Sequence, residues 1–129
     1  MRRKPASFAK GERLCGIKAI SRLFAEGKSM AFPPLRVIYA IMPGDTELQP
    51  ARVLISVPKR HFRKAVDRNL IRRRIREAYR KNKMPLVSSL AEAGKRIELA
   101  IIWTDTKIRP YSETERSVIE MVQKLSRLK

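Results

Sequence analysis

The sequence predicts an α+β fold, an α/β sandwich in which a small mixed sheet of three to four strands packs against about three helices. Two patterns favour it: apolar residues recur at helical spacing in separate segments, and shorter runs rich in β-branched residues lie between these segments. The chain has 129 residues and is 43% hydrophobic, which is enough for one domain with its own core. We therefore expect a single domain over residues 1–129 with the element order α-β-β(-β)-α-β-α.

The first predicted elements are a short helix and two strands. Apolar residues fall at helical spacing between residues 16 and 26, and Gly27 is placed to end this helix. An apolar run at residues 35–42 follows Pro33-Pro34, and a second run covers residues 52–57. The short gap between the two runs predicts an antiparallel hairpin.

The second half of the chain predicts two further helices, a weaker helical pattern between them and a central strand. A basic segment from residue 65 onward lacks Gly and Pro as far as Pro85 and should be helical. A weaker helical pattern at residues 86–93 is followed by Gly94, and the nearly continuous apolar run at residues 97–103 predicts a buried strand. Residues 112–115, Ser-Glu-Thr-Glu, fit a capping box at the start of the last helix.

Positive charge is concentrated in one part of the chain. The whole sequence has 30 Lys and Arg against 12 Asp and Glu, a formal net charge of +18. Residues 59–81 carry 11 basic and 2 acidic side chains, which is half of the net charge. Residues 1–13 hold a smaller excess, and we expect them to form a flexible basic N-terminus. Clustered charge of this kind indicates a surface that binds a polyanion.

One face of the basic helix carries the cations. At about 100° per residue, the apolar side chains fall on one half of the helix. A domain of this size needs these side chains for its own core. The opposite arc holds Asn69, Arg72, Arg73, Arg76 and Arg80. A solvated face usually mixes both signs of charge, whereas this one is positive throughout and rich in Arg, whose planar fork matches phosphate groups. Nucleic acid is therefore favoured over a membrane surface or a calmodulin-like partner.

Several other classes are excluded. The single cysteine, Cys15, rules out an intrachain disulfide and a multi-Cys zinc site, and the single histidine, His61, rules out a His cluster. No apolar stretch predicts a membrane span or a secretory signal, so we expect a cytoplasmic protein with no membrane or DNA partner. Carboxylates are few and scattered, so we expect no catalytic residue, no metal site and no cofactor on the chain itself.

The order of residues around the basic helix is specific. Ser56-Val57-Pro58-Lys59-Arg60 leads into Ala65-Val66, and then come Arg68-Asn69 and Arg72-Arg73-x-x-Arg76-Glu77-Ala78-Tyr79-Arg80. An Arg-Asn pair, basic residues three and four positions after the Asn, and a following Arg-Glu resemble the signature of the bacterial ribonuclease P protein subunit. The first helix, ending in Phe24-x-x-Gly27, and a strand that carries Tyr39 agree with that family's layout.

This resemblance implies an accessory protein in a ribonucleoprotein whose RNA removes the 5′ leader of precursor tRNA. The implied partners are the catalytic RNA and precursor tRNA, and the chemistry and its Mg²⁺ ions belong to the RNA. The implied contacts with the catalytic RNA are Lys59, Arg60, Arg68, Asn69, Arg72, Arg73, Arg76 and Arg80. The implied cleft for the single-stranded leader contains Phe8, Phe24 and Tyr39.

The chain departs from the family pattern at two places. Arg63-Lys64 stands where family members often have Gly-Asn, and Ile20 takes the place of an aromatic residue on the first helix. The alternative function is a general RNA-binding protein, such as a ribosomal or RNA-chaperone module. Such a protein would use the same basic helix but would not need an aromatic cleft.

Overall fold

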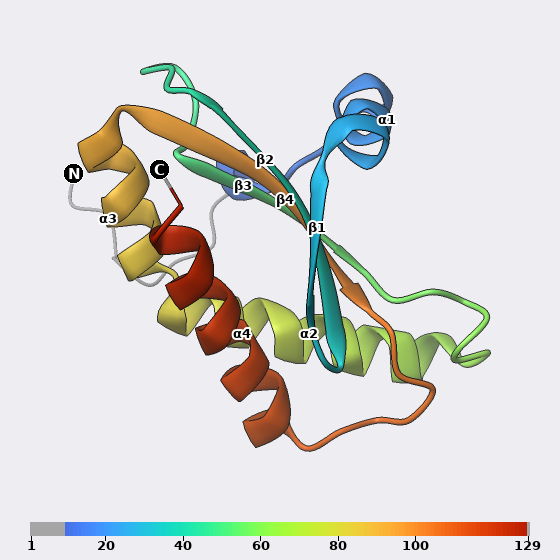
Figure 1. Cartoon of the computed structure of the whole chain (residues 1–129). Coiled ribbons are helices and arrows are strands. Elements are labelled where there is room, and N and C mark those ends of the chain that lie inside the picture. The colour runs from blue at the N-terminus through green and yellow to red at the C-terminus, as the bar shows by residue number, and fades with distance from the viewer. Residues whose placement is uncertain (1–9, 129) are drawn as a thin grey trace.

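Four strands form one mixed sheet in the computed structural model, which describes residues 10–128 (Figure 1). The strands are β1 (Lys28–Phe32), β2 (Leu35–Pro43), β3 (Ala51–Ser56) and β4 (Lys95–Trp103), and their order in the sheet is β1-β2-β4-β3. β2 pairs antiparallel with both β1 and β4, whereas β3 pairs parallel with β4. β4 is therefore an inner strand, as predicted.

Helices lie on both faces of the sheet but very unequally. The α-helices described are α1 (Ile17–Glu26), α2 (Ala65–Asn82), α3 (Met84–Ala93) and α4 (Tyr111–Ser126), preceded by a 3₁₀ turn, η1 (Lys10–Glu12). Figure 1 shows α2, α3 and α4 together on one face and α1 alone on the other. The predicted α+β class with a small mixed sheet is confirmed, and the described residues hold four α-helices where about three were expected.

The main core lies between the sheet and the three helices. Alternate residues of β2, Leu35, Val37 and Tyr39, point into it, because successive side chains of a strand face opposite sides. β4 is buried at every position from Ile97 to Ile101, where Ile97, Leu99 and Ile101 belong to the main core, Ala100 packs under α1, and Glu98 pairs with Arg52 and Arg96. The predicted core residues Phe62 and Trp103 are confirmed.

The predicted hairpin between the runs at residues 35–42 and 52–57 is wrong. β4 lies between β2 and β3, and the chain returns to it through α2 and α3 because a parallel pair needs a long crossover. The antiparallel neighbour of β2 along the chain is instead β1, which a tight turn at Pro33-Pro34 joins to it. β1 was not predicted because only Met30 and Phe32 are apolar side chains packed against the core.

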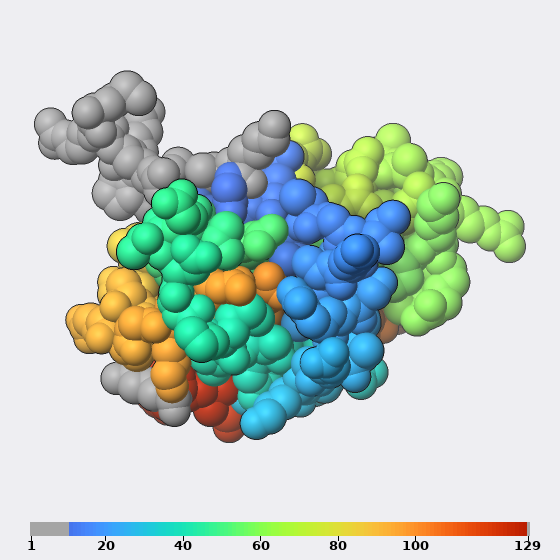
Figure 2. Space-filling view, turned by 90° about the horizontal axis from the view of Figure 1, so that it is seen from above, coloured from blue at the N-terminus to red at the C-terminus, as the bar shows by residue number. Residues whose placement is uncertain are grey.

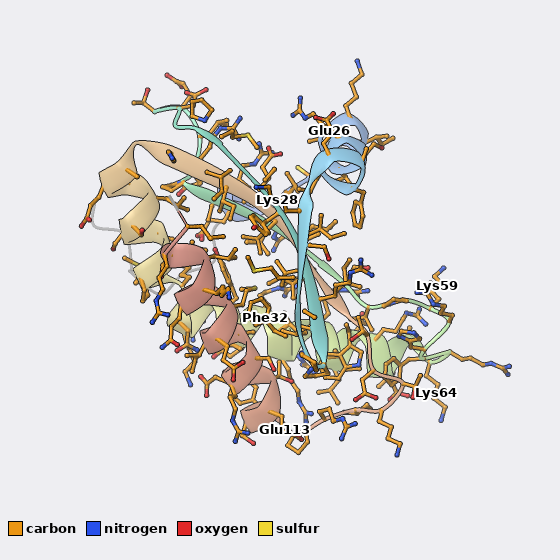
Figure 3. All side chains as sticks on the ribbon, viewed as in Figure 1. Glu26, Lys28, Phe32, Lys59, Lys64 and Glu113 are labelled. Atoms are coloured by element: carbon orange, nitrogen blue, oxygen red, sulfur yellow. The ribbon has the colours of Figure 1, made fainter. Side chains whose placement is uncertain are left out.

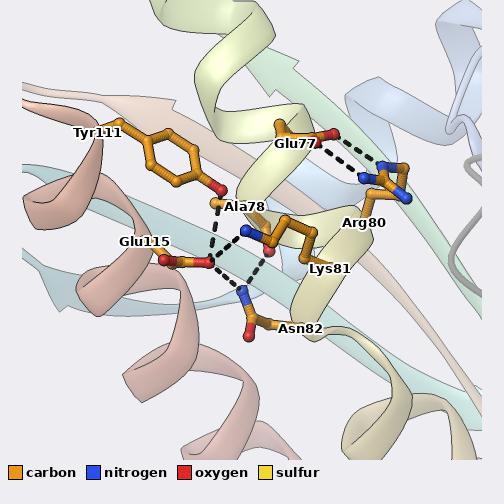
Figure 4. A network of polar contacts seen from close by, with 7 residues as sticks. All are labelled: Glu77, Ala78, Arg80, Lys81, Asn82, Tyr111 and Glu115. Carbon is orange, nitrogen blue, oxygen red and sulfur yellow. Dashed lines mark hydrogen bonds and ion pairs between the residues drawn. The ribbon is translucent and has the colours of Figure 1, made fainter.

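Helix ends follow the sequence in some places and not in others. Gly27 follows α1, and Gly94 ends α3 with the left-handed backbone, φ 65°, that favours glycine. The predicted capping box at residues 112–115 is wrong, since α4 begins at Tyr111 after Pro110 and has no side-chain cap. Glu115 instead accepts a hydrogen bond from Asn82 Nδ2 (3.1 Å), which ties α4 to the end of α2, and a second one from Tyr111 Oη (3.4 Å) within α4 (Figure 4).

The described structure begins inside the segment 1–13, which was expected to be flexible. Residues 10–12 form η1, and Arg13 forms a parallel bridge with Val53 of β3. Residues 1–9, which include Phe8, lie outside the described residues. In the part that the structure describes, no helix is long and apolar enough to cross a bilayer.

Candidate nucleic-acid interface

The buried side of α2 fixes which of its residues can reach a partner. Ile71, Ile75, Ala78 and Tyr79 are buried against the sheet and α4, as their helical spacing predicted. Burial also raises the pKa of the Tyr79 hydroxyl. Because this apolar stripe is committed to the core, the opposite side of α2 must face away from the sheet.

We call Asn69, Arg72, Arg73, Arg76 and Arg80 the arginine face of α2. Asn69 and Arg73 are exposed and the other three are half-buried. Arg72 Nη1 donates to Asn69 Oδ1 at 2.8 Å, so the asparagine orients an arginine and leaves its charge intact. Among residues 10–128 no carboxylate lies within ion-pair distance of Arg72, Arg73 or Arg76. The face therefore presents several uncompensated positive charges within three helical turns.

Arg80 differs from its neighbours because an acidic side chain already holds it. Its Nε and Nη2 donate to the two carboxylate oxygens of Glu77 at 2.7 and 2.8 Å (Figure 4). This paired hydrogen bond with Arg80 lowers the pKa of Glu77, so the carboxylate stays charged at neutral pH. Arg80 therefore has fewer free hydrogen-bond donors and less uncompensated charge for binding a phosphate than Arg73 or Arg76.

Two arginines of α2 support neighbouring loops. Arg68 Nη1 donates to the carbonyl oxygens of Phe62 and Arg63 at 2.8 and 3.0 Å, and so holds the chain that enters the helix. Arg74 Nη1 donates to the Arg109 carbonyl at 2.8 Å and fixes the loop before α4. Arg68 was predicted as an RNA contact, and its guanidinium serves first as a brace for the loop in which Lys59 and Arg60 lie.

Lys59 and Arg60 extend the positive surface beyond the start of α2. Both are exposed in the loop between β3 and α2, which a turn from the His61 N–H to the Pro58 carbonyl (3.2 Å) shapes. Figure 3 shows Lys59 and Lys64 at the same end of the molecule, away from Glu26 and Lys28. Arg63 and Lys64, which replace the Gly-Asn of the family pattern, are exposed there too.

The face of the sheet that carries α1 is only partly covered. Under α1, Leu23 packs on a row of side chains that includes Ile38, Leu54 and Ala100. The next row lies two residues, roughly 7 Å, further along the strands. It crosses all four strands as Ala31, Arg36, Ile102 and Ser56, which we call the open row.

The open row combines one cation with small and apolar side chains. Ala31 and Arg36 are exposed, and Ile102 and Ser56 are half-buried. Arg36 Nε donates to Ser29 Oγ at 3.0 Å, which steadies the guanidinium over the strands. In Figure 2, which looks down on this side, α1 (blue) covers part of the sheet and orange atoms in the range of β4 remain visible beside it.

Of the three aromatic residues predicted for a leader cleft, the structure leaves Phe24 accessible. Its side chain is 45% exposed on α1, next to the buried Leu23 that anchors the helix to the sheet. Ile20 packs into the small cluster beneath α1, so the missing second aromatic is replaced by a core residue. Phe8 lies outside the described part of the chain.

Tyr39 does not share a face with the open row. It is only 7% exposed and belongs to the main core on the helix-covered side, because it alternates in register with Val37 and Leu35. Tyr39 also lines a hollow of about 480 Å³ together with Glu26 and Lys28. The placement of Tyr39 beside Phe24 in one cleft, as expected from the sequence, is therefore corrected.

Arg36 and Ile102 were missed by sequence reasoning. Alternation along residues 35–42 does place Arg36 opposite Leu35 and Val37, which is a usable signal. Their alignment in one row, however, depends on β4 pairing with β2, and the predicted hairpin gave β2 a different neighbour. Among residues 10–128, no group of three or more His, Cys, Asp and Glu side chains is placed to hold a metal ion.

Comparison with known proteins identifies the family. The family model described as Ribonuclease P matches residues 8–126, which include the basic helix, the open row and Phe24. The chain belongs to the ribonuclease P protein family. A ribonuclease P protein is an accessory subunit of an endoribonuclease that matures the 5′ end of tRNA, so the sequence-based identification is confirmed over a general RNA-binding protein.

Two named relatives illustrate the similarity. The ribonuclease P protein component of Porphyromonas gingivalis is 35% identical over 116 residues, covering 88% of this chain and 84% of the relative. That of Chlorobaculum tepidum is 42% identical over 92 residues, covering 69% of this chain and 60% of the relative.

Solved structures agree in fold. The ribonuclease P protein of Staphylococcus aureus matches with a TM-score of 0.67 at 24% identity, covering 91% of this chain and 96% of that one. The protein from Thermotoga maritima matches with a TM-score of 0.68 at 21% identity, covering 88% and 96%. The mixed sheet with α1 on one face is therefore the fold of ribonuclease P proteins.

Proposed function

We propose that the arginine face of α2, extended by Lys59 and Arg60, docks this ribonuclease P protein on the catalytic RNA. The observation that supports it is the set of arginines at positions 72, 73 and 76, which are accessible and have no carboxylate partner among the described residues. Like charges this close repel each other, and a phosphate backbone relieves that repulsion. The face runs roughly 16 Å along the helix, at about 1.5 Å per residue, so it spans several phosphates.

In this proposal the chain supplies binding and charge, and the RNA supplies the chemistry. The Mg²⁺ ions of the reaction are held by the catalytic RNA, and the arginines reduce repulsion between RNA and precursor tRNA. We place the assembled enzyme in the cytoplasm.

Salt dependence tests the docking surface. The three unpaired arginines with Lys59 and Arg60 would displace about five counterions, so the logarithm of the affinity for the catalytic RNA should fall with a slope of about −4 against the logarithm of salt concentration. A fluorescence titration at several KCl concentrations measures this slope. A slope near zero would contradict docking through this surface.

We further propose that the open row and Phe24 contact the single-stranded 5′ leader of precursor tRNA. Arg36 provides a donor for a phosphate, and Phe24 provides an exposed ring on which an unpaired base can stack, whatever its identity. Tyr39 is left out of this surface because it is buried on the other face of the sheet.

Substitution of Phe24 tests the leader contact. One stacked base contributes about 1 kcal/mol or more, so Phe24→Ala should weaken binding of precursor tRNA to the assembled complex by about fivefold. Binding of mature tRNA, which has no leader, should be unchanged. The control is Ile17→Ala, since Ile17 is an exposed aliphatic residue of the same helix. Equal losses for precursor and mature tRNA would show that Phe24 does not contact the leader.

A further inference from the structure

A hollow of about 220 Å³ lies at the outer edge of β3, where three parts of the chain meet. One wall is the segment after η1, with Arg13 and Cys15, and the floor is formed by Leu54 and its neighbours on β3. The other wall is α2, which contributes Arg72 and Arg76. Three arginines from two separate segments therefore line one hollow.

The residues on either side of Arg13 hold it in place. Glu12 is buried and pairs with the buried Lys83 Nζ at 2.5 Å, at the junction of α2 and α3. Leu14 is buried beneath α1, and its N–H donates to the Val53 carbonyl at 2.9 Å. Glu12, at the end of η1, and Leu14 are buried on either side of Arg13, so the side chains of Arg13 and Cys15 are the ones left at the surface. Both are exposed and line the hollow.

The electrostatics of the hollow favour an anion. The acidic residues next to these arginines in the sequence already have cationic partners, since Glu12 pairs with Lys83 and Glu77 pairs with Arg80. Arg72 and Arg76 stand one helical turn apart, where like charges destabilise a helix until a counter-charge is bound. With about 30 Å³ for each water, the hollow has room for a phosphate group and some solvent.

We propose that Arg13, Arg72 and Arg76 together bind one backbone phosphate of the catalytic RNA, and that the Glu12–Lys83 pair positions Arg13 for this contact. The planar forks of three arginines can donate several charge-assisted hydrogen bonds to the oxygens of one phosphate. This inference rests on the proposed docking of α2, and it adds a third segment of the chain to that surface.

Substitutions made singly and together distinguish a phosphate bound in the hollow from docking through α2 in general. Arg13→Gln should weaken catalytic-RNA binding about tenfold, as Arg76→Gln should, but either variant should change the salt slope by less than one, because the other two arginines still neutralise the shared phosphate. The double variant should lose less than the product of the two, since both arginines hold one phosphate. Arg116→Gln, an exposed arginine of α4, is the charge-matched control.

The outcomes are distinct. If Arg76→Gln weakens binding while Arg13→Gln behaves as Arg116→Gln does, the hollow is not a phosphate site but docking through α2 stands. If neither Arg13→Gln nor Arg76→Gln has an effect, docking through α2 fails as well. Losses that multiply in the double variant would mean separate phosphates and would overturn the shared site.

Cys15 provides a test that leaves every arginine in place. It is the single cysteine of the chain and lines the hollow, so alkylation by iodoacetamide reports on access to it. Saturating catalytic RNA should slow alkylation at least tenfold, whereas precursor tRNA alone should not. An alkylation rate unchanged by the catalytic RNA would overturn the proposal, and protection by precursor tRNA alone would assign the phosphate to the substrate instead.

The positioning role of the buried pair is tested by removing both charges together, because a single substitution would leave the other charge buried and unpaired. Glu12→Gln/Lys83→Met should weaken RNA binding as much as Arg13→Gln, and adding Arg13→Gln should then change little. Unaltered RNA binding by the folded double variant, as judged by circular dichroism, would show that the pair does not position Arg13.

Discussion

Replacing Arg73 and Arg76 together by Gln should weaken binding of the catalytic RNA about 100-fold and reduce the magnitude of the salt slope by at least about one. Each arginine is accessible and without a carboxylate partner among the described residues, so each is expected to contribute a charge-assisted phosphate contact of about 1.5 kcal/mol or more. Stability should change little, since neither side chain belongs to the core. Titration of labelled RNA at two or more salt concentrations measures both quantities.

The matched control is Arg116→Gln/Arg127→Gln, which removes the same charge from exposed positions on and just beyond α4. It should retain nearly full affinity, because long-range attraction between exposed charges is largely screened at physiological salt. Arg80→Gln should have a smaller effect than Arg73→Gln, because Glu77 already pairs with Arg80. Similar losses in the control and in the α2 variant would mean that net charge, not the arginine face, determines binding.

Gly27→Ala should destabilise the fold by about 3 kcal/mol, at the upper end of the usual cost of overpacking. A methyl group at residue 27 would lie 2.5 Å from the Leu23 carbonyl oxygen and 2.8 Å from Ile38 Cγ2. Relief requires α1 to move off β2, which would also displace Phe24. Urea unfolding followed by circular dichroism measures the loss.

Gly11→Ala is the control for this substitution. At residue 11 the nearest atom to an added methyl group is Gln49 Cγ at 3.5 Å, an ordinary contact with a flexible side chain. Stability there should be unchanged or rise by up to about 1 kcal/mol, since alanine restricts the unfolded chain. Equal stability of the two variants would contradict the close packing of α1 on β2.

The arginine face could be predicted from the sequence because it depends on one helix. A stretch without Gly or Pro, with Ile71, Ile75 and Tyr79 at helical spacing, determines which side is buried, and the position of the arginines follows from the helical repeat. The pairing of Arg80 with Glu77 could also be predicted, since residues three apart are neighbours on a helix.

The sheet surface could not be predicted in the same way, because it depends on how strands are ordered. Alternation shows that Arg36 and Tyr39 face opposite sides of β2, but which side is open depends on where the helices pack. The insertion of β4 between β2 and β3 is a long-range pairing that local pattern does not encode. The sequence therefore did not show that Tyr39 packs in the main core on the helix-covered side.

Contacts between residues far apart in the sequence could not be predicted either. Glu12 and Lys83 are 71 residues apart, and nothing near either residue indicates that they form a buried pair. The expectation of a flexible segment up to residue 13 followed from its charge, yet this pair and the bridge to Val53 hold residues 12 and 13 against the fold.

Cleavage of precursor tRNA by the catalytic RNA of the same organism, with and without this protein, tests the central claim most directly. At low magnesium concentration the RNA alone should cleave slowly, because repulsion between its phosphates and those of the substrate is poorly screened. Addition of the protein should increase the cleavage rate several-fold or more, and the Arg73→Gln/Arg76→Gln variant should require a much higher concentration for the same effect. A cleavage rate that does not change when saturating protein is added would contradict this account.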